Sequence, residues 1–535
     1  TGTTGGVALG NFTQLNTMQS GASGADITIG GGAANLSDAN RPSGAATDSG
    51  AHGISLGSSS ATSVVVMRAG TGAISLNGHS TSTGSFSGIN LYPGNDLVGA
   101  TVNIRGVTGY NADGEGGTGI FGYYNSTAKT VIHATGSFAT DTPAVQLYSE
   151  SASVWGSLFG PSASSTDAIT VRASGDRAGV VITGTTSRAS SRGLWIGGLT
   201  VETRNGPTIL DSADDSSILG RNSGLIFTYR PVGGPGGDLT FRTPHNAESQ
   251  PFAINTAGKV SYLPSGASFT SPQTFPTAGS NINVGGLEVG SVNNTADLTV
   301  GAAIDSTSEV TYRGGSIAVG ANISSTNGSV AFLSTVASKT YTTTNSATIT
   351  AGQGVTISSM GTSSTVNTGA GAISAATVRI SSASTVTSAT PITAQGVVEI
   401  SSSAGNTTVS GGVSAAGDIN IVGGDVAVNA ALTTTNSRNI TINPRAAYTG
   451  TGTLNSAGTL TISGGTTVTP TGNLTAAGNI TISGSGQVNV TDRTVASASG
   501  NISVSAGPTA GNALVIERST ISTTAGRIDL RATST

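Results

Sequence analysis

The sequence predicts an all-β protein that folds as a right-handed parallel β-helix, with about 20 residues and three short strands per coil. Three observations predict it. The unit Gly478-Asn479-Ile480-Thr481-Ile482 recurs in variant form at intervals of 20 to 26 residues. Its apolar residues alternate with Thr, Ser or Asn, as expected for a strand with one inward and one outward face. No stretch combines a helical period with helix formers and caps.

The recurring unit forms the first predicted strand of each coil. With its first residue as position zero, apolar side chains occupy positions two and four and are expected to point inward. Position zero falls at Ser308, Gly328, Gln353, Ala376, Gly396, Gly417, Arg438, Gly458, Gly478, Gly500 and Gly526. The predicted core ladder consists of Ile400, Ile419, Ile421, Ile440, Ile442, Leu460, Ile462, Ile480, Ile482, Ile502 and Val504.

Two further strands complete each predicted coil. A second apolar pair follows the first, as at Ile317/Val319, Val426/Val428 and Val488/Val490. A third apolar position lies four residues before position zero, at Ile392, Val413, Leu454 and Leu474. Gly, Ser and Asn separate the strands, and we expect Gly and Asn to provide the left-handed backbone that tight corners require.

The regularity of the repeat divides the chain into two predicted parts. Residues 273–535 form a regular β-helical shaft. Residues 1–272 contain similar apolar pairs at uneven spacing and 18 of the 23 aromatic residues, so we expect wider coils with loop excursions. Trp155, Trp195 and the pair Tyr123-Tyr124 are interpreted mainly as core residues, with a sugar-stacking surface as the alternative. The repeat is least distinct between residues 205 and 272.

Composition restricts the function classes. Only 9% of residues are charged and the net charge is -4, so a basic nucleic-acid-binding face is not expected. The absence of cysteine excludes disulfides and thiol-based metal sites or catalysis. No run approaches the ~20 apolar residues of a membrane-spanning helix. Because the chain begins Thr1-Gly2 and ends within a repeat, we expect an interior or processed piece of a longer polypeptide.

Parallel β-helices include enzymes, so catalytic residues were considered. The segment around His52 resembles the glycine-histidine-glycine strand of polygalacturonases, and Asp214-Asp215 resembles their paired aspartates. However, the aspartates follow His52 by about 160 residues, which at ~20 residues per coil separates them by roughly eight coils. Two catalytic carboxylates must lie within ~10 Å of one another across the scissile bond, with any partner residue beside them. We therefore predict no catalytic residues and no enzyme.

The sequence predicts no specific metal-binding site and no specific modification site. His52, His79, His133 and His245 are scattered, without partners at metal-binding spacing. Residues 111–116 resemble the start of an EF-hand loop, but Gly122 occupies the position of its required glutamate. Residues 233–238 are interpreted as a Gly-rich turn. Asn-x-Ser/Thr sequons are attributed to composition; they include Asn11, Asn35, Asn125, Asn406, Asn439, Asn473, Asn479 and Asn501. No cofactor is predicted.

The repeats, such as SAGTLTISGGTTVTPTGNLTAAGNITISGSGQVNVTD, resemble the shafts of filamentous-haemagglutinin-like exoproteins of two-partner secretion. The resemblance covers most of residues 273–535 and, more faintly, the earlier half. The NPNG and NPNL motifs of the family's secretion domain do not occur, and Asn443-Pro444 is followed by Arg445. The resemblance implies a Gram-negative cell-surface or secreted filamentous protein acting in attachment, aggregation or biofilm matrix.

The expected function is therefore structural or adhesive. Expected partners are cell-surface or matrix components, including carbohydrate, and other copies of the chain stacked end to end; nucleic acid is not among them. A bacteriophage tail spike or fibre segment is the alternative, because it also uses Gly-, Ser- and Thr-rich β-helices. A β-helical polysaccharide-degrading enzyme is a third reading, and it would require acidic and basic residues clustered on successive coils.

Overall fold

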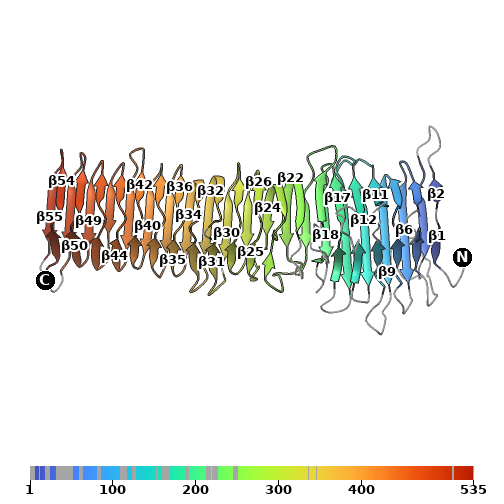
Figure 1. Cartoon of the computed structure of the whole chain (residues 1–535), viewed down its shortest axis with the longest axis horizontal. Coiled ribbons are helices and arrows are strands. Elements are labelled where there is room, and N and C mark those ends of the chain that lie inside the picture. The colour runs from blue at the N-terminus through green and yellow to red at the C-terminus, as the bar shows by residue number, and fades with distance from the viewer. Residues whose placement is uncertain are drawn as a thin grey trace. The chain divides into compact units, whose positions relative to one another are not determined.

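The computed structural model shows a parallel β-helix with strands β1 to β55 and, in the residues described, no helix (Figure 1). It describes residues 6–10, 12–17, 24–31, 52–58, 64–80, 86–108, 117–122, 128–151, 155–159, 168–186, 192–212, 218–219, 227–244, 251–334, 336–344, 346–508 and 511–533. The described chain forms two compact units. The first unit contains residues 1–296 and 301–305, and the second contains residues 297–300 and 306–535.

In the second unit, the recurring sequence unit forms one continuous ladder of parallel strands, ladder D. Its strands are β27 (Val310–Arg313), β30 (Val330–Ser334), the later parts of β32 (Ile349–Ser359) and β34 (Ile373–Ser382), β37 (Val398–Ser402), β40 (Ile419–Gly423), β43 (Ile440–Pro444), β46 (Leu460–Ser463), β49 (Ile480–Gly484), β52 (Ile502–Ala506) and β55 (Ile528–Ala532).

Two other ladders complete the coils of the second unit. Ladder E contains β25 (Leu298–Val300), β28 (Ile317–Val319), β31 (Thr340–Thr343), β33 (Thr365–Thr368), β35 (Val386–Ser388), β38 (Thr407–Val409), β41 (Val426–Val428), β44 (Ala447–Gly450), β47 (Thr467–Pro470), β50 (Gln487–Thr491) and β53 (Leu514–Glu517). Ladder F contains β29 (Ile323–Ser325), the first parts of β32 and β34, β36 (Ile392–Ala394), β39 (Val413–Ala415), β42 (Leu432–Thr434), β45 (Leu454–Ser456), β48 (Leu474–Ala476), β51 (Thr494–Ser497) and β54 (Thr520–Thr523).

The register of ladder D aligns position two of every repeat with position two of the next. Val398 pairs with Ile419, which in turn pairs with Ile440, and the alignment continues through Ile480 to Ile528. Every residue of the core ladder named from the sequence has an exposed fraction of 0%. The intervening threonines, such as Thr481, keep part of their surface in water. The three-strand coil is therefore present as predicted.

The first unit also has three ladders, and most of its coils are longer than those of the second unit. Ladder A contains β1 (Val7–Leu9), β4 (Ile54–Leu56), β7 (Ile89–Leu91), β10 (Ile120–Gly122), β13 (Trp155–Phe159), β16 (Arg192–Ile196) and β19 (Ile218–Leu219). Ladder B contains β2 (Thr13–Asn16), β5 (Val65–Arg68), β8 (Asp96–Gly99), β11 (Thr130–Ala134), β14 (Ile169–Ala173), β17 (Leu199–Thr203) and β20 (Phe227–Pro231).

Ladder C contains β3 (Ile27–Gly31), β6 (Ala73–Ser80), β9 (Thr101–Thr108), β12 (Thr142–Ser151), β15 (Ala178–Thr186), β18 (Thr208–Ser212) and β21 (Leu239–Arg242). Two long strands, β22 (Phe252–Leu263) and β24 (Asn281–Val289), continue both ladder B and ladder C, and β23 (Gln273–Thr274) is a short strand between them in sequence. The strand β26 (Ile304–Ser306) lies where the sequence passes from one unit to the other.

The two units differ in the number of residues per coil rather than in the type of strand that they contain. In ladder C, aligned residues are 28 positions apart from Ile74 to Val102 and 43 apart from Val102 to Val145. In ladder D the interval is 20 to 26 residues throughout. The two compact units meet at residues 297–306. The boundary expected near residue 272 is a different one, because it separates irregular from regular coils. It stays a prediction.

The position-zero glycines have a role other than the left-handed corner expected of Gly and Asn, which does occur at Asn436, Gly464 and Gly465. None of Gly396, Gly417, Gly458, Gly478, Gly500 and Gly526 has a positive φ. Instead, the backbone of the preceding coil occupies the place of a side chain. A Cβ on Gly526 would lie 2.0 Å from the carbonyl oxygen of Gly500, and one on Gly417 would lie 2.3 Å from the carbonyl carbon of Gly396. These glycines permit close stacking of successive coils.

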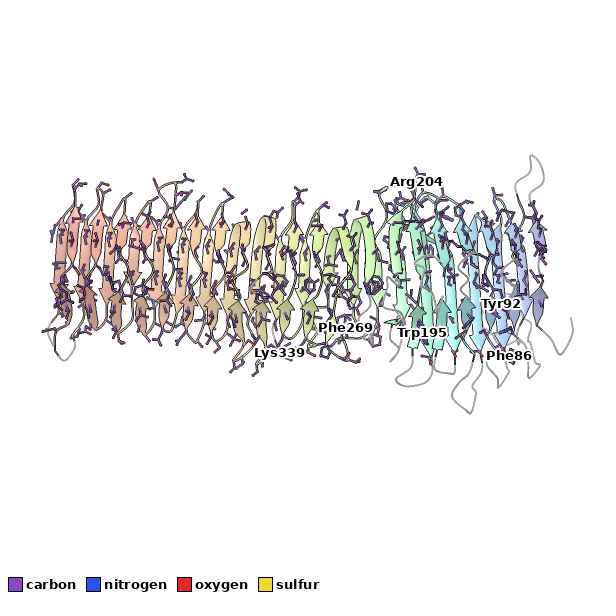
Figure 2. The ribbon with its side chains drawn as sticks, in the orientation of Figure 1. Phe86, Tyr92, Trp195, Arg204, Phe269 and Lys339 are labelled. Carbon is purple, nitrogen blue, oxygen red and sulfur yellow. The ribbon has the colours of Figure 1, made fainter. Side chains whose placement is uncertain are left out.

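Several aromatic residues of the first unit fill its interior, whereas Phe12 is 73% exposed. Trp195 is 3% exposed, and seven aromatic side chains between residues 227 and 275 are buried: Phe227, Tyr229, Phe241, Phe252, Tyr262, Phe269 and Phe275 (Figure 2 labels Trp195 and Phe269). The rings of Tyr262 and Phe275 are stacked with centroids 4.5 Å apart. Core packing is thus confirmed for these residues and excludes sugar stacking on them. The side chain of Trp155 and the pair Tyr123-Tyr124 lie outside the described residues.

The inside and outside faces of ladder D give the first testable prediction. Ile480→Asp places a carboxylate where the isoleucine is fully buried, and we expect it to reduce the free energy of unfolding by at least about 4 kcal/mol. Thr481→Asp, one residue away on the outward face, is expected to change it by less than about 0.5 kcal/mol. Urea unfolding followed by circular dichroism measures both variants. Equal resistance of the two variants to urea would refute the assignment of the two faces.

Candidate functional site

His52, the residue considered for a polygalacturonase-like site, is part of a hydrogen-bonded corner. Its Nδ1 accepts a hydrogen bond from the Ser87 backbone N–H at 2.9 Å, and its Nε2 lies 3.0 Å from the Asn90 side-chain amide. Its ring packs edge-on against Phe86, 5.2 Å between centroids (Figure 2 labels Phe86). Burial lowers the pKa of His52, partly offset by the Ser87 hydrogen bond. Both nitrogens and one edge of the ring are thus engaged in structure.

The remaining sequence candidates are only partly described by the structure. Asp214-Asp215, His245 and residues 111–116 lie outside the described residues, as do the sequons at Asn11, Asn35 and Asn125. His79 lies on β6 and His133 on β11. Among the residues that the structure describes, no three His, Asp or Glu side chains are close enough together to hold a metal ion. The Gly-rich segment 233–238 forms a bend in which Gly233 and Gly236 have positive φ.

The described sequon asparagines have a structural role that composition alone did not suggest. In five of them the side-chain oxygen accepts a hydrogen bond from a backbone N–H in the following coil. Asn439 accepts from Thr459 at 2.8 Å, Asn479 from Asn501 at 2.8 Å, and Asn501 from Arg527 at 2.8 Å. Asn406 and Asn473 accept in the same way from Asp425 and Thr494. The asparagines therefore tie consecutive coils together at their corners.

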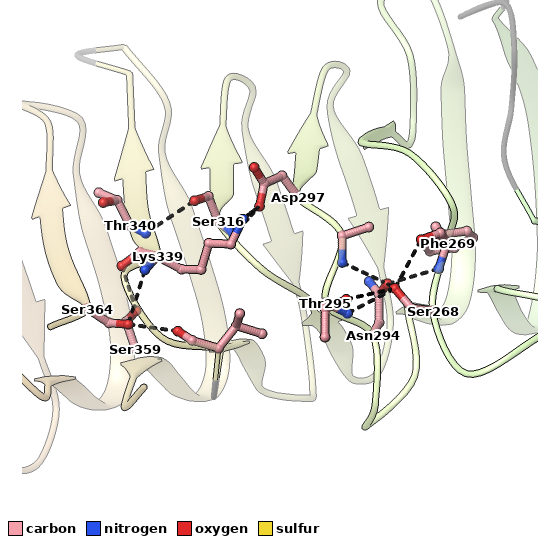
Figure 3. A network of polar contacts seen from close by, with 12 residues as sticks. Ser268, Phe269, Asn294, Thr295, Asp297, Ser316, Lys339, Thr340, Ser359 and Ser364 are labelled. Carbon is pink, nitrogen blue, oxygen red and sulfur yellow. Dashed lines mark hydrogen bonds and ion pairs between the residues drawn. The ribbon is translucent and has the colours of Figure 1, made fainter. Parts of the chain in front are cut away.

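Similar side-chain bridges occur in both units (Figure 3). In the second unit, Asp297 Oδ1 accepts from the Ser316 N–H at 2.7 Å and from Lys339 Nζ at 2.8 Å. In the first unit, Asn294 Oδ1 accepts from Ser268 Oγ at 2.9 Å and from the Phe269 N–H at 3.2 Å. These side chains join segments of neighbouring coils outside the backbone ladders.

An ion-pair ladder occupies the outward face of ladder B. Arg172, Glu202 and Arg230 are aligned on β14, β17 and β20. Glu202 is 3% exposed and accepts from Arg172 Nε at 2.5 Å and from Arg230 at 2.7 Å. Burial alone would raise the pKa of Glu202, but the hydrogen bonds and charges of the two arginines outweigh it and lower the pKa. The paired charges make this ladder a stabilising feature without free binding capacity.

A second group of ionisable side chains lies on the outward face of ladder C, and we call it the Arg105 cluster: His79, Arg105, Tyr148 and Glu150. Strands β6, β9 and β12 align Asn77 with Arg105 and Tyr148, and His79 with Val107 and Glu150. The Arg105 guanidinium carbon lies 5.0 Å from the centre of the Tyr148 ring. The Tyr148 hydroxyl donates to Glu150 Oε2 at 3.2 Å. Two successive coils thus place a cation, a phenol and a carboxylate together, and His79 lies on the coil before them.

The charge of Arg105 is only loosely matched within the cluster. Its side chain is 18% exposed, and its closest carboxylate oxygen, Glu150 Oε2, is 3.9 Å from Nη2. Arg105 Nε is buried without a hydrogen-bond partner among the described residues. Arg172, by comparison, is 35% exposed and has a carboxylate at 2.5 Å. The cluster therefore holds a largely buried cation whose nearest carboxylate among the described residues is beyond hydrogen-bonding distance.

The ionisation of the neighbouring groups follows from their burial. Burial, followed by the charge of Glu150, raises the pKa of Tyr148, so its hydroxyl stays protonated at neutral pH. Burial also lowers the pKa of His79, with the nearby Glu150 opposing the change and Arg105 adding to it. At neutral pH the cluster presents Arg105 as its cation and Glu150 as its anion. Sequence reasoning missed this group, because Arg105 and Tyr148 are 43 residues apart and the irregular coil length conceals their register.

Comparison of the chain with protein-family models, curated proteins and solved structures gave no match. The structure supports the parallel β-helical repeat that the resemblance implied, while the haemagglutinin-type family and its secretion route remain expectations. No helix in the described parts of the chain is long and apolar enough to cross a membrane.

The buried carboxylate of the ion-pair ladder gives a prediction on stability. Glu202→Gln removes the charge shared by Arg172 and Arg230, and we expect a loss on the order of 2 kcal/mol in the free energy of unfolding. Tryptophan fluorescence during urea unfolding reports on the first unit, because Trp155 and Trp195 both belong to it. As a control, Glu399→Gln breaks the exposed pair with Arg379 and should cost less than about 0.5 kcal/mol. Similar losses in both variants would contradict the prediction.

The histidines give a prediction on pH. The pKa values of His52, His79 and His133 are each lowered, first of all by burial, so protonation favours the unfolded chain. Stability from these residues is complete above the unfolded pKa of about 6.5 and is lost as the pH falls below it. The tryptophan-detected melting temperature of the first unit should therefore be lower at pH 5.5 than at pH 7.5. A variant with all three changed to glutamine should show a smaller difference, and an unchanged difference would refute this cause.

Proposed function

We propose that this chain is a structural and adhesive shaft, exported by a Gram-negative bacterium to the cell surface or the surrounding matrix, where it mediates attachment, aggregation or biofilm formation. The observation that carries the proposal is the unbroken register of ladder D from Val310 to Ile528. Each added coil of this kind lengthens the protein along one axis and packs on the core of the coil before it, so no separate core is needed. Such an architecture suits a spacer with many similar contact points.

The outward face of ladder D supports this proposal. Thr441, Thr461 and Thr481 occupy one outward column on successive coils. In the neighbouring column, Ser483 Oγ donates to Ser463 Oγ at 3.1 Å. Hydroxyl groups repeated at the ~4.8 Å strand spacing offer many weak polar contacts to a surface. When many weak contacts share one rigid support, their combined strength rises through effective concentration.

Attachment of coated beads tests the proposal. Beads carrying the complete chain should bind to or aggregate bacterial or host cells more than beads carrying albumin. Beads carrying the Ile480→Asp variant should bind less, because the coils around it no longer present their columns in register. Binding equal to that of albumin beads would overturn the adhesive function.

Light scattering of the purified chain tests its assembly. We expect a monomer of 52.1 kDa, or end-to-end assemblies whose mass increases with concentration. A stable trimer would instead favour a bacteriophage tail fibre, and release of sugars from polysaccharides would favour a β-helical enzyme.

A further inference from the structure

The chain contains three Asn-Gly pairs, at residues 77–78, 205–206 and 327–328, and the structure places them in different surroundings. An asparagine followed by glycine is chemically labile, because the glycine has no side chain to hinder the approach of its nitrogen to the asparagine side chain. The attack requires the side-chain amide to rotate and the main chain to leave its extended form. The three pairs can therefore be ranked by the contacts that hold each of them in place.

Two of the three pairs are held by the fold. Asn77 and Gly78 lie inside β6, which pairs with β3 on one side and β9 on the other, and Asn77 is 4% exposed. Asn205 lies at an exposed corner, but both ends of its side-chain amide are bonded. Its Oδ1 accepts from the Arg177 N–H at 2.7 Å, and its Nδ2 donates to Asp176 Oδ1 at 2.6 Å. Neither asparagine can turn toward the next nitrogen without breaking these contacts.

Asn327 also lies at a corner, but its side chain lacks these restraints. It is exposed, in the bend formed by residues 326–328. Its main chain is tied to the neighbouring coils, since its N–H donates to the Thr307 carbonyl oxygen at 3.1 Å and its carbonyl oxygen accepts from Gln353 Nε2 at 3.0 Å. Its side-chain amide, in contrast, forms no hydrogen bond with any described residue, and neither does the Gly328 N–H. The amide that would be attacked and the nitrogen that would attack it are thus both unengaged.

We propose that Asn327 is a site of spontaneous deamidation in the folded protein. The Gly328 nitrogen bonds to Asn327 Cγ and gives up its proton, Nδ2 leaves with that proton as ammonia, and water opens the resulting cyclic imide at one of its two carbonyl carbons. The product is aspartate or isoaspartate, and either one adds a negative charge to the second unit. The change falls between β29 and β30, and corners of this kind already differ in length from coil to coil, so ladder D keeps its register. The inference is independent of the adhesive function.

Incubation of the complete chain at mildly alkaline pH, followed by trypsin digestion and mass spectrometry, tests the inference. The peptide of residues 314–339 should gain the mass that accompanies replacement of an amide by an acid at Asn327, and isoaspartyl methyltransferase should label it. We expect Asn327 to react roughly ten-fold or more faster than Asn205, because two hydrogen bonds must break at Asn205 before its amide can rotate. Asn327→Gln should abolish the labelling of this peptide. In the urea-unfolded chain the three Asn-Gly pairs should react at similar rates, because the contacts that distinguish them are lost.

A second variant tests whether hydrogen bonding of the amide sets the rate. Asp176→Ala removes the acceptor of Asn205 Nδ2, so it should raise the rate at Asn205 by a few-fold and leave Asn327, in the other unit, within about two-fold of its original rate. Reaction at Asn77 in the same digest would show that the variant has unfolded, and the two sites in the unchanged chain then decide. Absence of product at Asn327, equal rates at Asn205 and Asn327 in the folded chain, or an unchanged rate at Asn205 in folded Asp176→Ala would each overturn the inference.

Discussion

Parallel pairing between successive coils is the constraint on which this structure depends. Each strand donates and accepts hydrogen bonds with the coil before it and the coil after it, so no strand can shift by one residue without turning its apolar face to water. Extra residues are accommodated only between strands. The step from Val330 to Val355 contains five more residues than the step from Val310 to Val330, yet the aligned residues remain buried. Strand register, rather than coil length, is therefore what the repeat preserves.

The same constraint determines the chemistry of both faces. Because each side chain lies above its counterpart in the preceding coil, inward columns collect apolar residues of similar shape, as in the pairs Ile421–Ile442 and Ile462–Ile482. Outward columns place charges a strand spacing apart, where like charges repel. The alternation of Arg172, Glu202 and Arg230 satisfies this requirement. Asparagine and aspartate at the corners, such as Asn479 and Asp418, extend the pairing beyond the strands by accepting backbone N–H groups from the next coil.

The sequence was informative where the period is short and regular. Ladder D could be located residue by residue, because its apolar pairs recur every 20 to 26 residues and tolerate no change of face. It did not reveal the role of position-zero glycines such as Gly526, because a glycine required by a neighbouring backbone looks the same in sequence as one required by a positive φ. It missed the Arg105 cluster, because intervals of 28 and 43 residues on either side of Arg105 give no period from which register can be inferred. When coil length varies, the alignment of strands in successive coils can be assigned only from the three-dimensional structure.

The irregularity that hid the cluster also explains how one could arise there. In a short, regular coil every outward position belongs to a column whose neighbours are a single strand spacing away, and hydroxyl or amide side chains fit such columns without repulsion. The strands β6, β9 and β12 are longer than those of ladder D, with 8, 8 and 10 residues, and provide several outward positions in each coil. His79 and Glu150 occupy positions beyond the glycine column of Gly78 and Gly106, where a Cβ on either glycine would meet the backbone that leads into ladder A. Groups of unlike charge can therefore gather on the far ends of these longer strands while the inward ladder remains intact.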